Sequence, residues 1–290
     1  MADDHAEKYR NYKAQNEAKI EQEFLKGTKN ENLGVYCDLF SAKSGVDGQD
    51  GGIVTALLVK GIEEGIFDSA IVVQRKEGYN AEAVVADNVN DVMAARGTKY
   101  FRVKVTPKLR ELADQGKKKI AIVCTPCEVR AARKIQRTLK RNSSNQEVTI
   151  LGLFCSEAFN YGKLKEEIKT RLGVDIDKAE KIQIRNGKFT VHTDGKEYSC
   201  KVRDLGKAVE KGCHYCDDFS ARLADISVGA VGSQNGYSTV IVRSEAGKKM
   251  LKNLDIAKEE ADKEEIIKLS RFKKQRAEKS FAAHQQPTTT

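Results

Sequence analysis

Short apolar runs alternate with amphipathic helical segments through the middle of this chain, and this alternation constrains the fold more than any other feature. The strand-like runs and the helical patterns between them occupy residues 52–64 (helix), 69–74 and 81–87 (strands), 90–95 and 106–115 (helices), 119–124 (strand), 127–141 (helix), 148–155 (strand) and 160–173 (helix). This order is typical of α/β proteins. Asn-Gly and Asp-Gly turns within residues 180–203 are strong hairpin signals. The predicted fold class is therefore α/β, with a mixed sheet flanked by helices, a small antiparallel region and a cysteine-rich segment that binds a cluster.

The two ends of the chain differ from its middle. At 290 residues the chain can bury a large core, either in one domain or in two closely packed lobes. Residues 1–32 are polar and helix-prone, and they are predicted to form an extension that packs on a partner or frays. Residues 33–246 are predicted to form the core. Residues 247–290 are predicted to form a charged helical tail that ends in QQPTTT, which is expected to be mobile.

The net charge of +9 raises the question of nucleic-acid binding, because clustered Lys and Arg neutralise phosphates. Basic and acidic residues are interleaved almost everywhere, however, and no aromatic stacking signature accompanies them. The charge therefore favours an anionic small molecule or an acidic partner protein. No apolar stretch approaches the roughly 20 residues that span a bilayer, and the first ten residues lack the order of a signal peptide. A soluble protein of the cytoplasm is expected.

The chain contains seven cysteines, which in a reducing cytoplasm indicate metal or redox chemistry rather than disulfides. Cys213 and Cys216 lie three residues apart in GCHYC, so their thiolates can hold one metal centre on a tight turn. Cys124, Cys127 and Cys155 follow or end predicted strands. Strand ends of an α/β sheet face the crevice in which ligands bind. Four thiolates are therefore expected to meet at this edge.

Other readings of these cysteines stay open at this point. Free cysteine often packs as a small hydrophobe, which is the expected role of Cys37 in a strand and Cys200 in a hairpin. Four thiolates suit zinc as well as an iron-sulfur cluster, so a zinc-stabilised adaptor protein is a non-enzymatic alternative. His214 stands between two predicted ligands and is expected to face outward.

Three glycine-rich segments are candidates for cofactor binding. Residues 48–52 lead into a helix, where bare backbone and free helix N–H groups can hold a phosphate, although the GxGxxG order is absent. Residues 96–100 offer a glycine turn, a hydroxyl, two cations and an aromatic ring, and the alternative is a helix C-cap followed by surface residues. Residues 229–239 form either a plain hairpin or a wall against a flat ring. No Ser/His/Asp order stands out, and hydride chemistry needs none because a cofactor performs the difficult step.

Together, these segments and cysteines resemble the β subunit of the coenzyme F420-reducing hydrogenase, within the coenzyme F420 hydrogenase/dehydrogenase β-subunit family. The matching pieces span most of residues 34–243, and their order is highly specific. They are QDGGIVTALL at 49–58, GTKY at 97–100, TPC at 125–127, GLFC at 152–155, GCHYCDDF at 212–219 and ADISVGAVGS at 224–233.

The resemblance implies FAD and one [4Fe-4S] cluster in this chain, with hydride exchanged between FAD and coenzyme F420. The cluster ligands that it implies are Cys127, Cys155, Cys213 and Cys216, while Cys124 falls where relatives often carry a small residue. The FAD contacts that it implies are Asp50, Gly51, Gly52, Thr55, Gly97, Thr98, Lys99, Tyr100, Pro126, Gly232 and Ser233. Arg96, Arg102 and Lys104 are candidates for the polyanionic tail of coenzyme F420.

The chain lacks the extra ferredoxin-like cysteine motifs of some relatives, so its single cluster is expected to pass electrons directly to a partner subunit. The resemblance implies a hydrogenase, formate dehydrogenase or heterodisulfide reductase as that partner, in a hetero-oligomeric complex. The enzyme alternative is a related FAD and iron-sulfur reductase with another donor, such as the formate dehydrogenase β subunit or the hydroxymethyl-chlorophyll reductase type.

Overall fold

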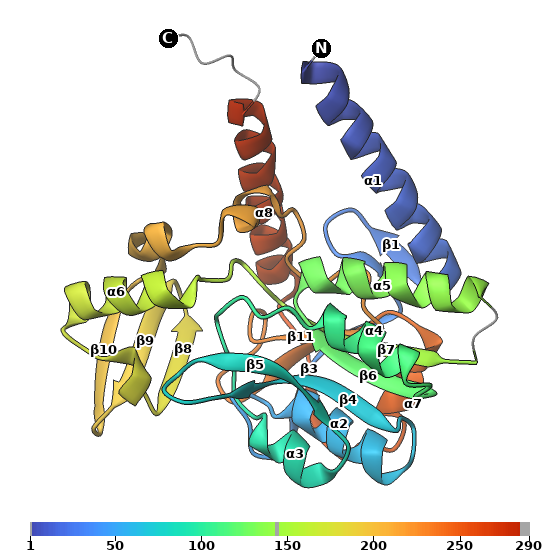
Figure 1. Ribbon diagram of the computed structural model, residues 1–290, viewed down its shortest axis with the longest axis horizontal. Coiled ribbons are helices and arrows are strands. Elements are labelled where there is room, and N and C mark those ends of the chain that lie inside the picture. Colours follow the sequence, from blue (N-terminus) through green and yellow to red (C-terminus); the bar gives the residue numbers. More distant parts are fainter. Residues whose placement is uncertain (1, 143–144, 285–290) are drawn as a thin grey trace.

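A computed structural model describes residues 2–142 and 145–284, and its largest feature is an eight-stranded mixed sheet (Figure 1). In spatial order its strands are β13 (Ile256–Glu259), β3 (Asp38–Ser44), β12 (Ser238–Val242), β11 (Ile226–Gly229), β7 (Glu147–Leu153), β6 (Lys119–Cys124), β4 (Ser69–Arg75) and β5 (Ala81–Ala86). The neighbours β11, β7, β6 and β4 run parallel, whereas the outer pairings are antiparallel. The predicted mixed sheet is confirmed. The predicted mobility of residues 285–290 falls outside the described residues.

Helices cover both faces of this sheet. The helices are α1 (Ala2–Phe24), α2 (Ile53–Glu63), α3 (Val89–Ala94), α4 (Thr106–Asp114), α5 (Pro126–Arg141), α6 (Tyr161–Leu172), α7 (Glu245–Leu251) and α8 (Lys263–His284), with 3-10 turns η1 (Ile176–Lys178), η2 (Val202–Ala208) and η3 (Lys211–Tyr215). Helices α4 and α5 lie on one face and α2 and α3 on the other (Figure 1). No described helix is both long and apolar enough to cross a membrane.

The side chains of strand β6 pack against helices on both faces of the main sheet. Ile120 and Ile122 pack with Leu109 of α4, whereas Ala121 between them packs with Leu57 of α2. Because successive side chains of a strand point to opposite faces, a parallel strand covered on both sides reads as a continuous apolar run. The run IAIVC at 120–124 is therefore apolar because both faces of the strand are covered.

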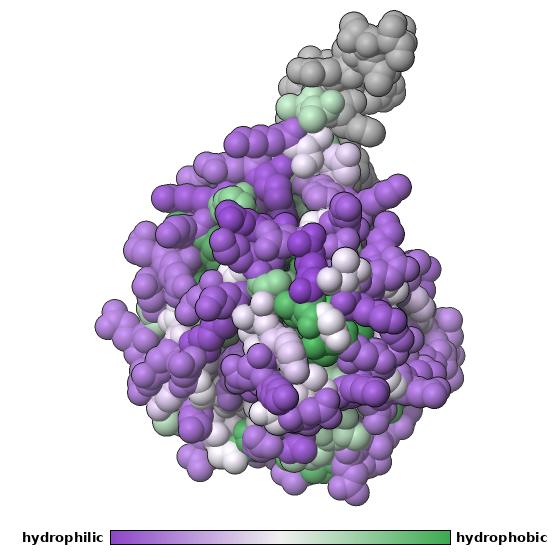
Figure 2. All heavy atoms as spheres, turned by 90° about the vertical axis from the view of Figure 1, so that its left-hand side faces the viewer, coloured by the Kyte–Doolittle hydropathy of each residue, from purple (hydrophilic) through white to green (hydrophobic). Residues whose placement is uncertain are grey.

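A separate three-stranded antiparallel sheet contains β8 (Lys181–Arg185), β9 (Lys188–Thr193) and β10 (Lys196–Lys201). Both residues of its Asn186-Gly187 and Asp194-Gly195 turns have positive φ, as two-residue hairpin turns require. The predicted antiparallel region is thus confirmed. Figure 2 shows the side of the molecule on which this sheet lies, and it is mostly hydrophilic with a small apolar area near its centre.

The end of the N-terminal helix packs on its own chain, while the role of residues 1–32 as an extension that packs on a partner or frays stays a prediction. Ile20 near the end of α1 and the following Leu25 are buried in the core beneath α4 and α5. A short hairpin, β1 (Thr28–Asn30) with β2 (Gly34–Tyr36), follows. The few apolar residues of this segment are enough to dock it because ion pairs, described below, also hold it in place.

The C-terminal segment differs from the single helical tail that its charge predicts. Helix α7 ends before Asn253, which adopts a left-handed conformation (φ 60°) that stops a helix. Strand β13 then pairs with β3 at the edge of the main sheet, and only α8 continues as a long helix. The boundary predicted after residue 246 therefore falls inside one structural unit, while a separate functional role for either end stays a prediction.

Candidate functional site

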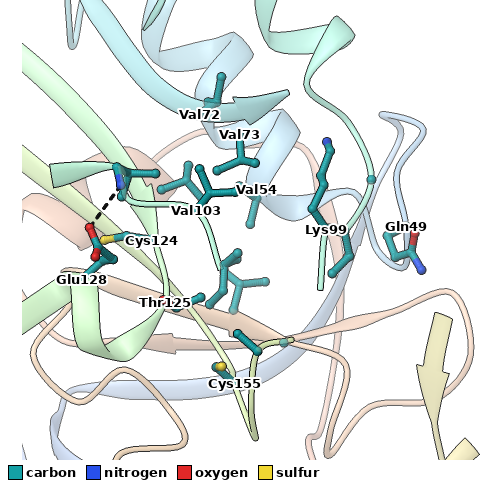
Figure 3. A pocket seen from close by; sticks show the side chains of 18 of the residues that line it. Gln49, Val54, Val72, Val73, Lys99, Val103, Cys124, Thr125, Glu128 and Cys155 are labelled. Carbon is teal, nitrogen blue, oxygen red and sulfur yellow. Dashed lines mark hydrogen bonds between the residues drawn. The ribbon is translucent and has the colours of Figure 1, made fainter. Parts of the chain in front are cut away.

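A cavity of about 280 Å³ lies where the parallel strands end at their carboxyl edge. Its apolar wall contains Val72 and Val73 of β4, Val123 of β6, Leu153 of β7 and Val228 of β11. Figure 3 shows Val72 and Val73 among the side chains that line it. Ligands of open α/β sheets bind in this crevice. The cavity therefore lies at the edge where the sequence predicts the site.

The loop between β3 and α2 forms one end of the cavity. Gly52 has φ 68°, and a Cβ atom there would lie 2.0 Å from the Val46 carbonyl oxygen. A Cβ atom on Gly51 would lie 2.3 Å from the Ala42 carbonyl oxygen. Only glycine fits both positions, so the loop presents bare backbone. Asp50, Gly52 and Thr55 line the cavity, whereas Gly51 is buried behind it and its N–H donates to Ser238 Oγ at 3.1 Å.

The start of α2 completes this end of the cavity. Its N-cap residue makes no side-chain capping hydrogen bond, and residues 52–55 of its first turn line the cavity. Unpaired N–H groups and the positive end of the helix dipole attract an anionic group. The loop and helix together can therefore accept a phosphate of a nucleotide cofactor.

Two charged side chains lie near this loop. Burial raises the pKa of Asp50, although Arg185 at 3.7 Å and Lys181 lower it. Lys99 Nζ donates to the carbonyl oxygens of Ala95 at 2.6 Å and Arg96 at 2.8 Å at the end of α3. Burial lowers the pKa of Lys99 to about 8, with a smaller contribution from Arg75. The cavity wall therefore carries an amine that can lose its proton near neutral pH (Figure 3).

The other predicted FAD contacts divide into two groups. Gly97, Thr98 and Pro126 line the cavity, whereas Tyr100, Gly232 and Ser233 do not. The Tyr100 ring lies against Phe189 of the small sheet, and burial raises its pKa to about 12. Gly232 and Ser233 lie by α8: the Gly232 N–H donates to Glu265 Oε2 at 2.9 Å, and Ser233 Oγ lies 2.8 Å from Thr239 Oγ1. Of the candidates for the coenzyme tail, Arg96 and Arg102 line the cavity and Lys104 does not.

The structure brings all four predicted ligand cysteines to the other end of the same cavity. Cys127 lies in the first turn of α5, Cys155 follows β7, Cys213 lies in η3 and Cys216 follows it. Burial raises the pKa of Cys155 to about 12 and also raises that of Cys213, while Lys273 lowers both. The neighbouring thiols also raise both values, so the four sulfur atoms lie within electrostatic reach of one another.

The thiols surround the cavity without converging on one point. Among the described residues, no group of three or more His, Cys, Asp or Glu side chains is placed to hold a single metal ion. Cys124 also lines the cavity, fully buried at the end of β6. Cys37 and Cys200 do not line it, in agreement with their predicted packing role.

Two cations of α8 at this end were not predicted from the sequence. Lys273 is 3% exposed and donates to the carbonyl oxygen of Cys155. Arg276 pairs with Glu157 at 2.7 Å and donates to the Ser156 carbonyl oxygen at 2.7 Å. Nothing in the pattern of a charged helix distinguishes these two residues from solvated ones, because only the docking of α8 buries them.

Ion pairs from α1 hold the segment that follows Cys216. Arg130 of α5 lies 2.6 Å from Glu17 of α1 and 2.7 Å from Asp217, and Lys13 lies 2.7 Å from Asp217. Burial alone would raise the pKa of Asp217, but these cations and Arg222 bring it well below its ordinary value. The carboxylate is therefore strongly stabilised in its charged form.

The buried carboxylate of Glu128 stabilises the cavity wall between the glycine-loop end and the cysteine end. Glu128 Oε2 accepts hydrogen bonds from the N–H groups of Val105 at 3.1 Å and Thr106 at 3.0 Å, and from Thr106 Oγ1 at 2.8 Å (Figure 3). It thereby joins the start of α4 to the helix that carries Cys127.

Comparison with known proteins identifies the family of this chain. Residues 40–110 match the N-terminal part, and residues 117–267 the C-terminal part, of the coenzyme F420 hydrogenase/dehydrogenase β subunit. The chain is 36% identical over 273 residues to the coenzyme F420 hydrogenase subunit beta of Methanothermobacter thermautotrophicus, covering 88% of this chain and 97% of that one.

Two further proteins extend the comparison. A coenzyme F420-dependent sulfite reductase of Methanocaldococcus jannaschii is 37% identical over 258 residues, which cover 83% of this chain but only 41% of the reductase. A chain of the F420-reducing [NiFe] hydrogenase complex from Methanosarcina barkeri superposes with a TM-score of 0.82 and 30% identity, covering 87% of this chain and 94% of that one. The chain therefore belongs to the coenzyme F420 hydrogenase/dehydrogenase β-subunit family of oxidoreductases.

Proposed function

We propose that this chain is an electron-transfer subunit that binds FAD and one [4Fe-4S] cluster and works on coenzyme F420. When bound, the flavin exchanges hydride with coenzyme F420, and the cluster carries single electrons to a partner subunit. The partner is of the hydrogenase, formate dehydrogenase or heterodisulfide reductase type. One observation carries this proposal: a phosphate-accepting glycine loop and four thiols line the same cavity.

The residues at the loop end fit a flavin nucleotide. Gly52 lines the cavity with bare backbone, and the uncapped start of α2 can hold a phosphate. The valines of the strand ends offer an apolar surface to a flat ring and exclude water. Lys99 would stand beside that ring as an amine that can hold or release a proton near neutral pH, since its pKa is about 8.

The cluster is preferred over the zinc alternative because of the family to which the chain belongs. Four cysteines that the resemblance assigns to a cluster line one cavity wall, and four thiolates are the ligand set that a [4Fe-4S] cluster requires.

The test is anaerobic purification of the full chain, followed by flavin, iron and zinc analysis and by mixing with reduced coenzyme F420 and an artificial electron acceptor. We expect one FAD, about four iron atoms per chain and oxidation of the reduced coenzyme. Flavin and iron without oxidation would move the substrate to another donor. Zinc without flavin or iron would overturn the proposal.

A further inference from the structure

The ammonium group of Lys273 is buried among the predicted ligands of the cluster. The residue is 3% exposed, lines the cavity together with the four predicted ligand cysteines, and donates to the Cys155 carbonyl oxygen. The side chain therefore places a buried ammonium group beside these cysteines.

This cation forms no ion pair with a carboxylate in the described part of the chain. Asp218, a carboxylate close enough to Lys273 to act on it electrostatically, accepts two hydrogen bonds from the Arg222 N–H and lies 3.7 Å from the Arg222 guanidinium. A buried charge is costly unless an opposite charge compensates it. The cavity beside Lys273 is therefore built to hold negative charge that the protein alone does not supply.

Helix α8 is firmly docked at this position. Arg276, one turn further along, bonds to the residues that follow Cys155 and also donates to the Cys213 carbonyl oxygen at 3.4 Å. The ring of Phe281 lies 5.1 Å from the ring of Tyr215, which stands between Cys213 and Cys216 in the sequence. These contacts fix the position of Lys273 relative to the two segments that contain Cys155, Cys213 and Cys216.

We propose that Lys273 supplies the positive charge that balances the thiolate-bound cluster and raises its reduction potential. This inference rests on the proposed function, because it needs a cluster on the four cysteines. Reduction adds one electron to an already negative group, and a fixed buried cation lowers the free energy of that change. Lys273 lies beyond residue 267, where the match to the family ends, so the charge comes from a part of the chain that the family match does not include.

The test compares the full chain with its Lys273→Met and Lys273→Arg variants, reconstituted anaerobically and titrated electrochemically while the reduced cluster is followed by electron paramagnetic resonance. We expect Lys273→Met to retain the cluster and to hold at least about tenfold less of it reduced at a given potential, a shift of about −59 mV for one electron. Lys273→Arg keeps the charge and should titrate within a few-fold of the unaltered chain. Lys268→Met removes a charge from an exposed position of the same helix and should also leave the titration unchanged.

The outcomes separate this inference from the proposed function. A loaded Lys273→Met cluster with unchanged potential, or an Arg variant shifted as far as the Met variant, would overturn the role of the charge and leave the cluster in place. An unaltered chain without iron would overturn the cluster itself, and this inference with it. Should Lys273→Met not retain iron, Lys273→Gln is titrated instead. If Lys273→Met and Lys273→Gln both lose iron while Lys273→Arg keeps it, the result would support charge balance. The chains that hold the cluster would then be those with a cation at this position.

Discussion

The two terminal helices approach the same cysteine-rich segment but use their charges in different ways. Helix α1 contributes Glu17 and Lys13, and every one of these charges meets an opposite charge on Arg130 or Asp217. Helix α8 contributes Lys273, which meets carbonyl oxygen and sulfur instead. Paired charges hold segments together, whereas a buried charge without a carboxylate partner indicates that something anionic binds beside it. Helix α1 therefore has a structural role, whereas α8 takes part in the proposed site.

Removing a predicted ligand on the α8 side should have the largest effect. We expect Cys155→Ala to reduce the iron content of the anaerobically purified chain from about four atoms to near zero, because a cubane that loses one of four thiolates is poorly held. Cys200→Ala, in the hairpin outside the cavity, is the matched control and should keep its iron. Full iron content in the Cys155 variant would mean that the thiols around α8 are not the ligands, and the contrast between the helices would fail.

Removing the centre of the α1 network should destabilise the fold. Arg130→Ala leaves Glu17 and Asp217 without their shared partner, and the side chain of Arg130 is only 19% exposed. We expect the free energy of unfolding to fall by about 3 kcal/mol in denaturant titrations. Lys108→Ala, which breaks an exposed pair with Glu111, should cost less than about 0.5 kcal/mol. Equal effects of both variants would show that the α1 network is no stronger than an ordinary surface pair.

The same network predicts a dependence of stability on pH. Because the pKa of Asp217 is lower in the folded chain than in the unfolded one, its contribution is present above the ordinary value of 3.8 and is lost as pH falls further. We expect Asp217→Asn to cost about 2 kcal/mol at pH 7 and to lose less stability than the unaltered chain between about pH 5 and pH 3. Unfolding of the cofactor-free chain should be followed, since acid releases metal from thiolates. Parallel stability curves for the two chains would refute this role of Asp217.

The smallest effect is expected for the fifth thiol of the cavity. Cys124 is buried at the end of β6 and is not among the predicted ligands. Cys124→Ala should retain its iron and lose about 1 kcal/mol of stability, the typical cost of a small buried truncation. Cys127→Ala, three residues away on α5, should lose the iron. The reverse result would exchange the two residues in the ligand set.

Much of the site could be predicted because its parts are local in sequence. The glycine loop precedes a helix, the strands KIAIVC and VTILGLFC end in cysteine, and the hairpin turns follow from Asn-Gly and Asp-Gly. Parallel strands then bring distant cysteines to one edge. Each of these steps depends on neighbours along the chain or on a rule for sheets.

The remaining features depend on tertiary packing that no local pattern encodes. The sequence around Lys273 reads as a solvated helix, and only its docking on η3 buries the amine. Tyr100 stays a predicted flavin contact, while the packing of its ring near Phe189 depends on the distant small sheet. Strand β13 was missed because one half-buried and three exposed residues between two helices give little periodicity. Such features come from long-range contacts, which a pattern of neighbours does not contain.

The edge of the small sheet has a consequence for how this chain avoids unwanted association. Strand β8 lies at an edge, where free N–H groups would invite strand addition from another molecule. The hydroxyl oxygens of Tyr79 and Tyr100 accept the N–H groups of Ile182 and Ile184 at 3.0 Å each, and Gln49 donates to the Ile182 carbonyl oxygen at 3.1 Å. Side chains from the turn between β4 and β5, from the segment after α3 and from the cavity loop therefore occupy the β8 edge, so another chain cannot add a strand there without first displacing them.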